Sequence, residues 1–390
     1  MNAYLTSVIE NVKKKHSNEP EFVQTVEEVF SSLEPVIEKH PEYEKVDLLN
    51  RMVEPERMFT FRVSWEDDQG QWHTNIGYRC QFNGALGPYK GGLRFQANVY
   101  PGIIKFLGFE QIFKNSLTGL PIGGGKGGAD FDPAGKSDAE IMRFCQAYMQ
   151  ALYRYIGPDV DVPAGDMGVG GREIGYLFGE YRRLKGAWEN GVLTGKGFSY
   201  GGSLIRPEAT GYGAVYYLQN VLEHEGERIA GKTIACAGFG NVTWGICKKA
   251  TELGAKVVTL SGPDGYIYDP DGVATEEKIA YLVEMRSSGR NRVQDYAEKF
   301  GVEFFPGEKP WGVKADVVMP SAMQNDVHME QAKQIAANGV KYYIEVANMP
   351  TTNDALRFLM EQPGMIVAPS KAVNAGGVAT SALEMAQNSE

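Results

Sequence analysis

The sequence contains few cysteines, few histidines and no long hydrophobic run. Its four cysteines form no CxxC pair, and no two of its five histidines have the spacing of metal ligands. So few thiols in a large chain indicate a reducing compartment, and we therefore expect a cytoplasmic protein. The spacing of the histidines leads us to expect no metal site. The hydrophobic runs are too short to span a bilayer, and the first residues lack the layout of a signal peptide. These absences argue against a membrane protein and against a disulfide-rich secreted protein.

An excess of positive charge is also missing. Lys and Arg number 39 against 49 Asp and Glu, which gives a net charge of -10. A general affinity for nucleic acid or for an anionic membrane is therefore not expected. Glycine, in contrast, is plentiful, at 47 of 390 residues. Such an excess is typical of tight turns and of places where the backbone approaches a ligand closely.

The first 200 residues mix strands with helices. Alternation of apolar and polar residues predicts strands, and apolar residues at helical spacing predict helices. The predicted strands are 58–65 and 73–82, and the predicted helices are 22–37, 101–117 and one that opens at a Ser137–Glu140 capping box and ends near 155.

From about residue 205, predicted strands alternate with predicted helices. This alternation is typical of βαβ units and predicts a parallel sheet. The fold class is therefore α/β, with a mixed α/β domain over 1–200 and a doubly wound, Rossmann-like domain over 201–374. The predicted strands of the second domain are 232–237, 256–260, 315–319, 341–346 and 365–368, and its predicted helices are 206–224, 242–253, 275–286, 329–337 and 353–361.

A glycine-rich turn carries the clearest sign of a ligand. Gly238, Phe239 and Gly240 follow a predicted strand and precede a predicted helix. The first glycine permits the tight turn, and the second lets the backbone approach a pyrophosphate at the helix N-terminus. The third fingerprint position holds Thr243, where glycine or alanine is usual, and a threonine does not favour close packing of helix on strand. A turn without a ligand is the alternative, but the order of strand, turn, helix and second strand favours dinucleotide binding.

The end of the second predicted strand indicates which dinucleotide binds. The acidic residue that would bind the ribose 2′-hydroxyl is absent, because Leu260 and Ser261 stand there, and Asp264 follows shortly. No Lys or Arg lies within 261–270 to receive a 2′-phosphate. The sequence therefore favours NAD over NADP.

Three lysines lie in unusual surroundings. Lys90 and Lys126 are flanked by glycines, and Lys114 lies near the end of a predicted helix, where Gln111 shares its face. Several cations around one pocket favour a dianionic ligand and lower one another's pKa, which lets one lysine act as a base near neutral pH. The alternative for each lysine is a solvated surface residue. The residues around Lys126 do not fit the pattern of a phosphate-binding P-loop.

Asp166 lies in the turn-rich segment 161–168. A carboxylate beside a cationic pocket could relay protons. The alternative is a loop aspartate that caps its own turn.

Six segments together resemble the glutamate dehydrogenase family, within the Glu/Leu/Phe/Val dehydrogenase superfamily, and most closely its bacterial NAD-linked hexameric type. The resemblance runs from the N-terminal helices to the last residue, and long segments match in order. The segments are GPYKGGLRF (87–95), KFLGFEQIFKNSLTGLPIGGGKGGADFDP (105–133), DVPAGDMGVGGREIGY (161–176), RPEATGYG (206–213), AGFGNV (237–242) and PSKAVNAGGV (369–378).

The resemblance implies a fold, a reaction and an assembly. The first domain would bind substrate and assemble subunits, the second would bind the dinucleotide, and the chain would return to the first domain at about 375–390. The reaction would be the reversible oxidative deamination of L-glutamate to 2-oxoglutarate and ammonium, with NAD as coenzyme. The protein would be a homohexamer that binds neither nucleic acid nor membrane. Because chains of this family continue through further C-terminal helices, this chain is expected to be truncated.

The resemblance also implies roles for individual residues. Lys126 matches the catalytic lysine, which activates the water that attacks an iminium intermediate, and Asp166 matches the proton-relay aspartate. The remaining matches are Lys114, Gln111 and the backbone of Gly165 at the α-carboxylate, Lys90 and Ser381 at the γ-carboxylate, and Thr210 and Asn241 at the cofactor.

Three other functions remain open. A dehydrogenase for branched or aromatic amino acids would lack the cation and the hydroxyl that Lys90 and Ser381 supply. A non-catalytic dinucleotide sensor would have lost Lys126 or Asp166, and both are present. The third alternative is a glutamate dehydrogenase that prefers NADP.

Overall fold

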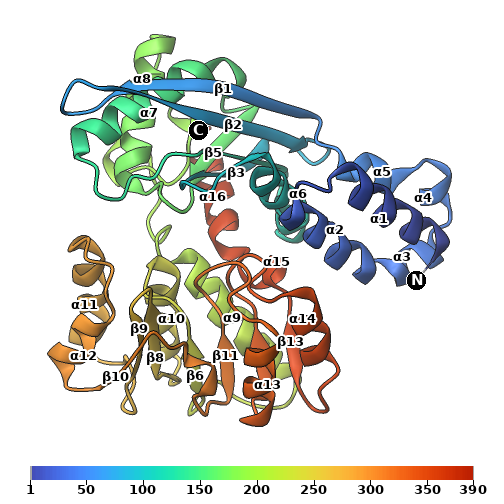
Figure 1. Ribbon diagram of the computed structural model, residues 1–390, viewed down its shortest axis with the longest axis vertical. Helices are drawn as coiled ribbons and strands as arrows, with labels where there is room; N and C mark the ends of the chain where they lie inside the picture. Colours follow the sequence, from blue (N-terminus) through green and yellow to red (C-terminus); the bar gives the residue numbers. More distant parts are fainter. Residues whose placement is uncertain (1, 390) are drawn as a thin grey trace. The chain divides into compact units, whose positions relative to one another are not determined.

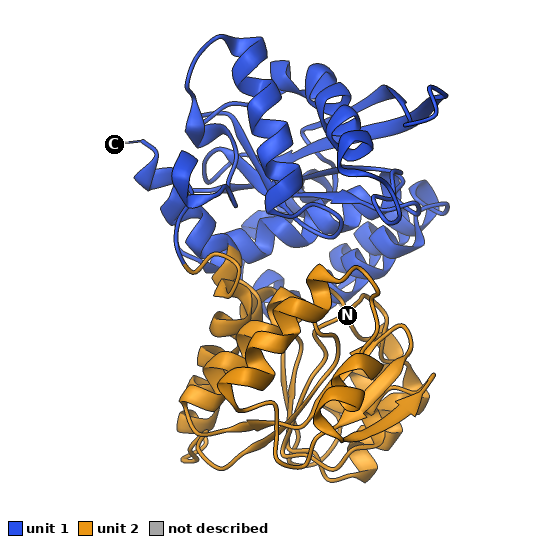
Figure 2. Ribbon diagram, turned by 90° about the vertical axis from the view of Figure 1, so that its left-hand side faces the viewer, with its two compact units in different colours: residues 1–204, 378–390 blue, residues 205–377 orange. Residues whose placement is uncertain are grey.

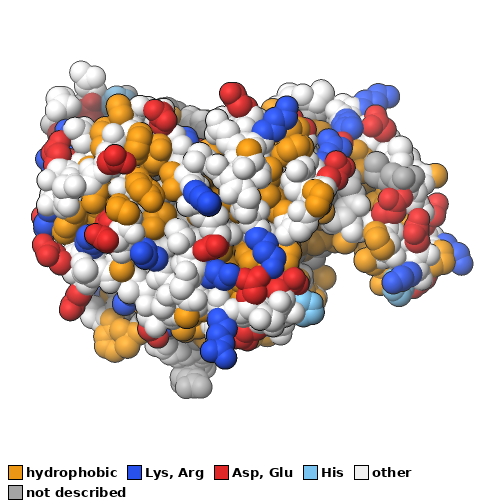
Figure 3. All heavy atoms as spheres, turned by 90° about the horizontal axis from the view of Figure 1, so that it is seen from below, with side chains coloured by type: hydrophobic (Ala, Val, Ile, Leu, Met, Phe, Trp, Pro, Cys, Tyr) orange, Lys and Arg blue, Asp and Glu red, His pale blue; other side chains and the backbone are white. Residues whose placement is uncertain are grey.

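The structure is a computed structural model that describes residues 2–389, and these form two compact units (Figures 1 and 2). Unit 1 contains the described residues up to Leu204 together with those from Val378 onward, and unit 2 contains Ile205–Gly377. Within the described chain, no helix combines the length and the apolar character needed to cross a bilayer. On the face drawn in Figure 3, basic and acidic side chains are interspersed, so that face offers no continuous basic stretch.

Unit 1 is built on a mixed five-stranded sheet in the order β1-β2-β4-β3-β5. β1 and β2 form an antiparallel hairpin, β4 pairs antiparallel with β2, and β3 runs parallel to β4 and β5. The strands predicted at 58–65 and 73–82 are confirmed as β1 and β2. The bounds are β1 Arg57–Glu66, β2 Trp72–Asn83, β3 Tyr89–Phe95, β4 Gly123–Ala129 and β5 Asp161–Gly165.

Helices cover both faces of this sheet (Figure 1). α6 packs on one face, where a Cβ on Gly124 would lie 2.9 Å from Ile112 Cα. α7 packs on the other face, where Tyr148 meets Phe61 edge to face. The helices that contribute to unit 1 are α1 Ala3–Lys15, α2 Pro20–Ser32, α3 Glu34–Lys39, α4 Glu42–Lys45, α5 Leu48–Val53, α6 Pro101–Leu117, α7 Asp138–Leu152, α8 Gly171–Lys185 and α16 Gly376–Gln387.

Three helix predictions in unit 1 have different outcomes. The helix predicted at 101–117 is confirmed as α6. The capping box is confirmed at the start of α7, where Ser137 Oγ accepts a hydrogen bond from the Glu140 amide at 3.1 Å. The single helix predicted at 22–37 is wrong, because α2 ends at Ser32 and α3 begins at Glu34. Pro35 explains the break, since proline lacks the amide and clashes with the carbonyl four residues earlier.

Unit 2 is built on a five-stranded sheet in the order β13-β12-β11-β6-β7, and every pair in it is parallel. Alternate residues of its strands face two separate cores, one with α9, α10 and α11 and the other with α13 and α14. The predicted doubly wound α/β fold is therefore confirmed. The bounds are β6 Thr233–Cys236, β7 Lys256–Val257, β11 Val317–Met319, β12 Tyr342–Ile344 and β13 Ile366–Ala368, with α9 Ala209–His224, α10 Asn241–Glu252, α11 Glu276–Ser287, α12 Gln294–Phe300, α13 Met329–Ala337, α14 Asn353–Met360 and α15 Ser370–Val373.

One strand prediction in unit 2 is wrong. The predicted strand 256–260 is divided between β7, which ends at Val257 in the parallel sheet, and β8, Thr259–Gly262. β8 belongs to a second, antiparallel sheet with β9, Gly265–Tyr268, and β10, Glu303–Pro306. A two-residue turn joins Gly262 to Gly265, and this hairpin gives β8 a new partner that the alternation of side chains does not reveal.

Candidate active site

The residues predicted as base and proton relay lie together in unit 1. Lys126 is in β4, and its Nζ forms an ion pair with Oδ2 of Asp166, which follows β5. The side chain of Lys126 is 5% exposed and that of Asp166 is 14% exposed. Glycine at position 92 permits this approach, because a Cβ there would lie 2.9 Å from Asp166 Cβ. The pair is therefore a buried feature of the sheet and not a surface contact.

Arg94 joins this pair, although it was not predicted from the sequence. Its Nη2 lies 3.6 Å from Asp166 Oδ1, and its side chain is 4% exposed. Its Nε and Nη1 atoms are buried without a hydrogen-bond partner among the described residues. The sequence contained a signal, because Arg94 lies four residues after Lys90, and residues an even number apart in a strand point to the same face.

Burial and charge set the protonation of this cluster. Burial, the largest influence, lowers the pKa of Lys126; Asp166 opposes this effect and Arg94 reinforces it. Burial alone would raise the pKa of Asp166, but Lys126 and Arg94 together hold it well below its usual range. Asp166 is therefore ionised at neutral pH, and Lys126 loses its proton more readily than an ordinary lysine. A lysine that acts as a general base near neutral pH needs such a lowered pKa.

Lys90 lies on the same face of the sheet. Strand alternation places Lys90 and Arg94 together on β3, and the register pairs Lys90 with Gly124, two residues before Lys126. The side chain of Lys90 is among the largest that the fold buries completely. Three cations thus project from one face of two neighbouring strands, and their mutual repulsion favours an anion bound among them.

α6 carries two further predicted residues. Gln111 is buried and donates from Nε2 to Asn115 Oδ1 at 2.6 Å, and Lys114 lies in the last turn of the helix. Asn115 was not predicted. It is fully buried, and its Nδ2 donates to the backbone oxygens of Lys90 and Gly123 at 3.1 and 2.5 Å. Asn115 therefore ties α6 to β3 and β4, and its position four residues after Gln111 was the available signal.

The predicted γ-carboxylate residue Ser381 lies on α16 and is 1% exposed. A buried ion pair holds this helix, because Lys196 Nζ lies 2.8 Å from Glu384 Oε1, about one turn beyond Ser381. Glu384 also accepts a hydrogen bond from the amide of Gly195 at 2.9 Å. Ser381 therefore belongs to unit 1, as Lys90 does, although the whole of unit 2 lies between them in the sequence.

The predicted dinucleotide turn lies in unit 2 between β6 and α10. Gly238 has a φ of 81°, which favours glycine, and its amide donates to Ser261 Oγ at 2.9 Å. Gly240 is extended and directly precedes α10, and nothing lies within 4 Å of the position that a Cβ would take there. Phe239 is buried and belongs to the core of this unit. The turn thus leaves room for an anion at the N-terminus of α10.

Thr243 fits this turn without loosening it. Its Oγ1 donates to Ala237 O at 3.0 Å and lies 3.2 Å from Ser321 Oγ. Glycine instead permits close packing of α10 on the start of α9, since a Cβ on Gly245 would lie 2.7 Å from Glu208 O. The Thr243 hydroxyl therefore binds the backbone at the end of β6 directly. The dinucleotide-binding fingerprint, which has glycine or alanine at this position, does not predict such a contact.

The other two predicted cofactor residues lie beside the turn. Thr210 is in the first turn of α9, which packs closely on α10, because a Cβ on Gly211 would lie 2.3 Å from Val242 O. Asn241 opens α10, is exposed, and accepts a hydrogen bond from Arg286 of α11. Arg286 lies outside the segment 261–270, and the fold brings it to the turn from α11.

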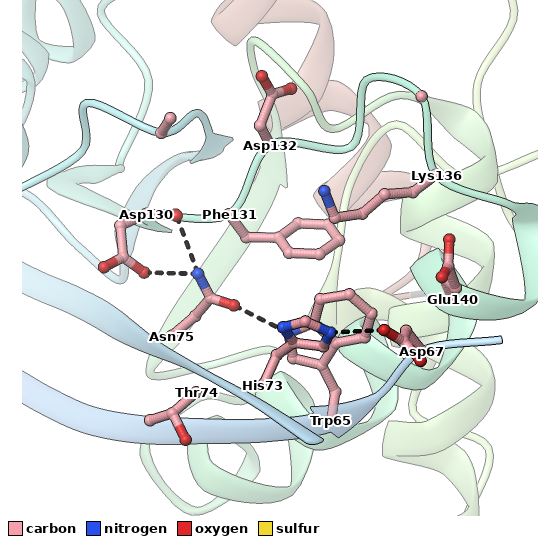
Figure 4. A pocket seen from close by; sticks show the side chains of 12 residues that line it. Trp65, Asp67, His73, Thr74, Asn75, Asp130, Phe131, Asp132, Lys136 and Glu140 are labelled. Atoms are coloured by element: carbon pink, nitrogen blue, oxygen red, sulfur yellow. Dashed lines mark hydrogen bonds and ion pairs between the residues drawn. The ribbon is translucent and has the colours of Figure 1, made fainter. Parts of the chain in front are cut away.

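Figure 4 shows a pocket of about 520 Å³ in unit 1 that none of these residues lines. Several of its polar groups bind one another: His73 Nε2 lies 2.7 Å from Asp67 Oδ2, and Trp65 Nε1 donates to Asn75 Oδ1 at 2.8 Å. Trp65 also packs edge to face with Phe131. The residues that the structure describes contain no cluster of three His, Cys, Asp or Glu side chains able to hold a metal ion.

Two protein-family models match most of this chain. The family model described as Glu/Leu/Phe/Val dehydrogenase, dimerisation domain, matches residues 55–183. The model described as Glutamate/Leucine/Phenylalanine/Valine dehydrogenase matches residues 201–390.

Individual relatives are similar over nearly the whole chain. The NAD-specific glutamate dehydrogenase of Clostridium symbiosum is 70% identical over 390 residues, which cover 100% of this chain and 87% of that protein. The NAD-specific glutamate dehydrogenase of Porphyromonas gingivalis is 57% identical over 378 residues, or 97% of this chain and 84% of that protein. A solved glutamate dehydrogenase structure at 70% identity has a TM-score of 0.98 and covers 100% of this chain and 86% of that one.

Proposed function

This chain belongs to the Glu/Leu/Phe/Val dehydrogenase family, and we propose that it catalyses the reversible oxidative deamination of L-glutamate to 2-oxoglutarate and ammonium with NAD as coenzyme. One observation carries the proposal: a buried Lys126–Asp166 pair shares a sheet face with Arg94 and Lys90. A proton acceptor beside two further cations suits a substrate with two carboxylates. The names of the similar relatives support both glutamate and NAD.

Substrate recognition is assigned to the cations around the base. Lys90 and Ser381 bind the side-chain carboxylate, because a buried carboxylate needs both a cation and a donor. Lys114, Gln111 and the backbone of Gly165 bind the α-carboxylate. Asn115 supports this arrangement, since it fixes α6 against β3 and β4.

The chemistry on the protein side is proton transfer. In the deamination direction, a hydride leaves Cα of glutamate and an iminium forms. Neutral Lys126 takes a proton from water as the water oxygen bonds to the iminium carbon. The nitrogen then regains that proton through Asp166. As the C–N bond breaks and the C=O bond forms, the hydroxyl proton passes to Lys126 and on to the departing ammonia, so that ammonium and 2-oxoglutarate form.

The turn in unit 2 fits NAD. Gly238 holds a conformation that other residues rarely adopt, and the open space at Gly240 suits a pyrophosphate against the first amides of α10. Thr210, Phe239 and Asn241 complete the candidate contacts. When bound, NAD supplies the hydride acceptor.

The proposal includes an assembly, a location and a division of labour. Unit 1 binds the substrate and assembles subunits, and unit 2 binds the dinucleotide. The subunits form a homohexamer, an assembly supported by the match of residues 55–183 to a dimerisation domain. The protein acts in the cytoplasm on small molecules, in keeping with its low cysteine content.

Initial rates with several substrates test the proposal. L-glutamate, norvaline, leucine and phenylalanine would each be assayed with NAD and with NADP. We expect the highest kcat/KM for glutamate with NAD. A higher value for leucine or phenylalanine would indicate one of the other family activities, and a higher value with NADP would overturn the coenzyme assignment.

A further inference from the structure

A second buried ion pair lies within the same sheet. Arg79 of β2 and Asp161 of β5 are both 0% exposed. The guanidinium binds both carboxylate oxygens, with Nε donating to Oδ2 at 2.9 Å and Nη2 donating to Oδ1. Its Nη1 donates to the backbone oxygen of Gly91 at 3.1 Å, and Gln81 donates to Asp161 Oδ2 at 3.1 Å. Arg79 thus joins strands β3 and β5 through one planar group.

The burial of two charges needs an explanation. Desolvation can exceed the attraction within such a pair, and packed hydrophobic side chains in its place are often equally stable. The contacts of Arg79 suggest a different reason. Gly91 directly follows Lys90 on β3, and Asp161 begins β5, which leads to Asp166. Each end of the hydrogen-bonded cluster therefore lies on a strand that carries a candidate site residue.

Arg79 also lies against β4, on the face opposite Lys126. The register pairs Arg79 with Gly127, and strand alternation places Gly125 and Gly127 on one face and Lys126 on the other. A Cβ on Gly127 would lie 3.0 Å from Arg79 Cδ, and one on Gly125 would lie 3.4 Å from Arg79 Nη2. The glycines that flank Lys126 therefore give the Arg79 side chain room to lie against the sheet.

We propose that Arg79, held by Asp161, is a positioning residue that sets the spacing of β3, β4 and β5 and thereby the relative placement of Lys90, Lys126 and Asp166. The planar fork of arginine suits this task, because it reaches a carboxylate and a carbonyl at once, which an ammonium group does less well. The inference rests on the proposed function, since its main readout is glutamate turnover.

Charge adds a second effect to position. Burial is the main reason for the lowered pKa of Lys126, but Arg79 also lowers it. Replacing Arg79 alone would leave the Asp161 anion unpaired, so the pKa of Lys126 should rise. Replacing both residues removes both charges, so that pKa should lie closer to its wild-type value than it does in Arg79→Met. The pH profile therefore separates the effect of charge from the effect of position.

The experiment compares Arg79→Met, Arg79→Lys and the double variant Arg79→Met with Asp161→Leu in the full chain. The readouts are thermal stability, kcat and KM for glutamate, and the pH profile of kcat/KM. We expect kcat of Arg79→Met to fall about 10- to 100-fold, because a small misplacement of reacting groups has effects of this size. Its pH limb should move to higher pH, and Arg79→Lys should recover part of the loss.

The double variant keeps the test decisive if Arg79→Met folds poorly. It should regain stability, and its pH limb should return toward that of the wild type, while kcat remains low. Lys278→Met is the matched control, because Lys278 Nζ makes a 2.7 Å ion pair with the buried Asp269 in unit 2. This control should lose stability and keep the kcat and pH limb of the wild type.

Two results would overturn the inference. Wild-type kcat in Arg79→Met would show that the placement of Lys126 does not depend on Arg79. Recovery of kcat together with stability in the double variant would show that the ion pair has only a structural role. A wild-type protein without glutamate turnover would instead refute the proposed function, which is a distinguishable outcome.

Discussion

At the scale of single residues, the reaction depends on the group that takes the proton from water. Lys126→Ala should lower kcat by about 10²-fold or more, the lower range for loss of a general base. Binding of 2-oxoglutarate should suffer less, because Lys90 and Lys114 remain. Steady-state rates and a binding titration measure both effects. Lys136→Ala, which replaces a lysine that lines the pocket in Figure 4, is a matched control. A near-normal kcat in Lys126→Ala would assign the role of general base to another group.

The charges around Lys126 make a prediction about pH with a definite sign. In the proposed mechanism, kcat/KM rises with pH as Lys126 loses its proton. Asp166 raises the pKa of Lys126, so Asp166→Asn should move this limb to lower pH while the maximal rate falls. Arg94 lowers the same pKa, so Arg94→Met should move the limb to higher pH. Shifts in the same direction would show that the limb reports a different group.

Substrate choice depends on the carboxylate at the end of the side chain. Lys90→Leu combined with Ser381→Val should reduce kcat/KM for glutamate, because a charge-assisted contact contributes about 1.5–3 kcal/mol, or roughly 10- to 150-fold. The value for norvaline should fall far less or rise, since an apolar pocket suits it. Both substrates would be assayed with both proteins. An equal proportional loss would mean that Lys90 and Ser381 support the site without recognising the side chain.

At the scale of secondary-structure elements, the placement of α16 depends on one carboxylate. Glu384→Gln would leave the Lys196 cation buried without its partner, a change that costs about 3–5 kcal/mol. Urea unfolding should show this loss, and KM for glutamate should rise because Ser381 lies on the same helix. Gln387→Ala is the control, because it removes an exposed hydrogen bond between the same helix and Ser203. Equal effects of the two variants would contradict the importance of the buried pair.

The elements that were predicted correctly are those with a local signal. β1 and β2 alternate in polarity, α6 begins with Pro101, and α7 begins with a capping box. β4 could not be predicted, because Gly123–Ala129 contains no β-branched or aromatic residue. Its glycines serve contacts with other elements, since a Cβ on Gly128 would lie 2.1 Å from Arg94 O. Such a constraint exists only in the folded sheet.

The residues of the candidate site also differ in how strong a local signal the sequence contained for each of them. Lys126 and Asp166 stood out because glycine-rich and turn-rich segments surround them, and the fold places them in contact. Arg94 and Asn115 gave weaker signals, because their partners come from other elements. Arg79 gave none, since its role depends on the pairing of β2 with β4. Contacts between elements far apart in the sequence decide these three positions.

At the scale of the whole molecule, each unit has a hydrophobic core of its own. One cluster of buried residues in unit 1 lies between Val63 and Leu193. The two clusters on the faces of the parallel sheet in unit 2 lie between Ala214 and Val373. Because none of these clusters mixes residues from the two units, unit 2 meets the main condition for folding as a separate domain.

This separation of cores predicts the behaviour of a fragment. A fragment of residues 201–374 should unfold cooperatively and bind NADH, because the Gly238–Gly240 turn and the core beneath it come entirely from this segment. The same fragment with Gly238→Ala is the control. A Cβ is strained at a φ of 81° and would lie 3.2 Å from Thr243 Oγ1, so the turn should distort and binding should weaken. Circular dichroism would measure folding, and NADH fluorescence would measure binding. A folded fragment that ignores NADH would refute the assignment of dinucleotide binding to this segment, and an unfolded one would show that its core needs the rest of the chain.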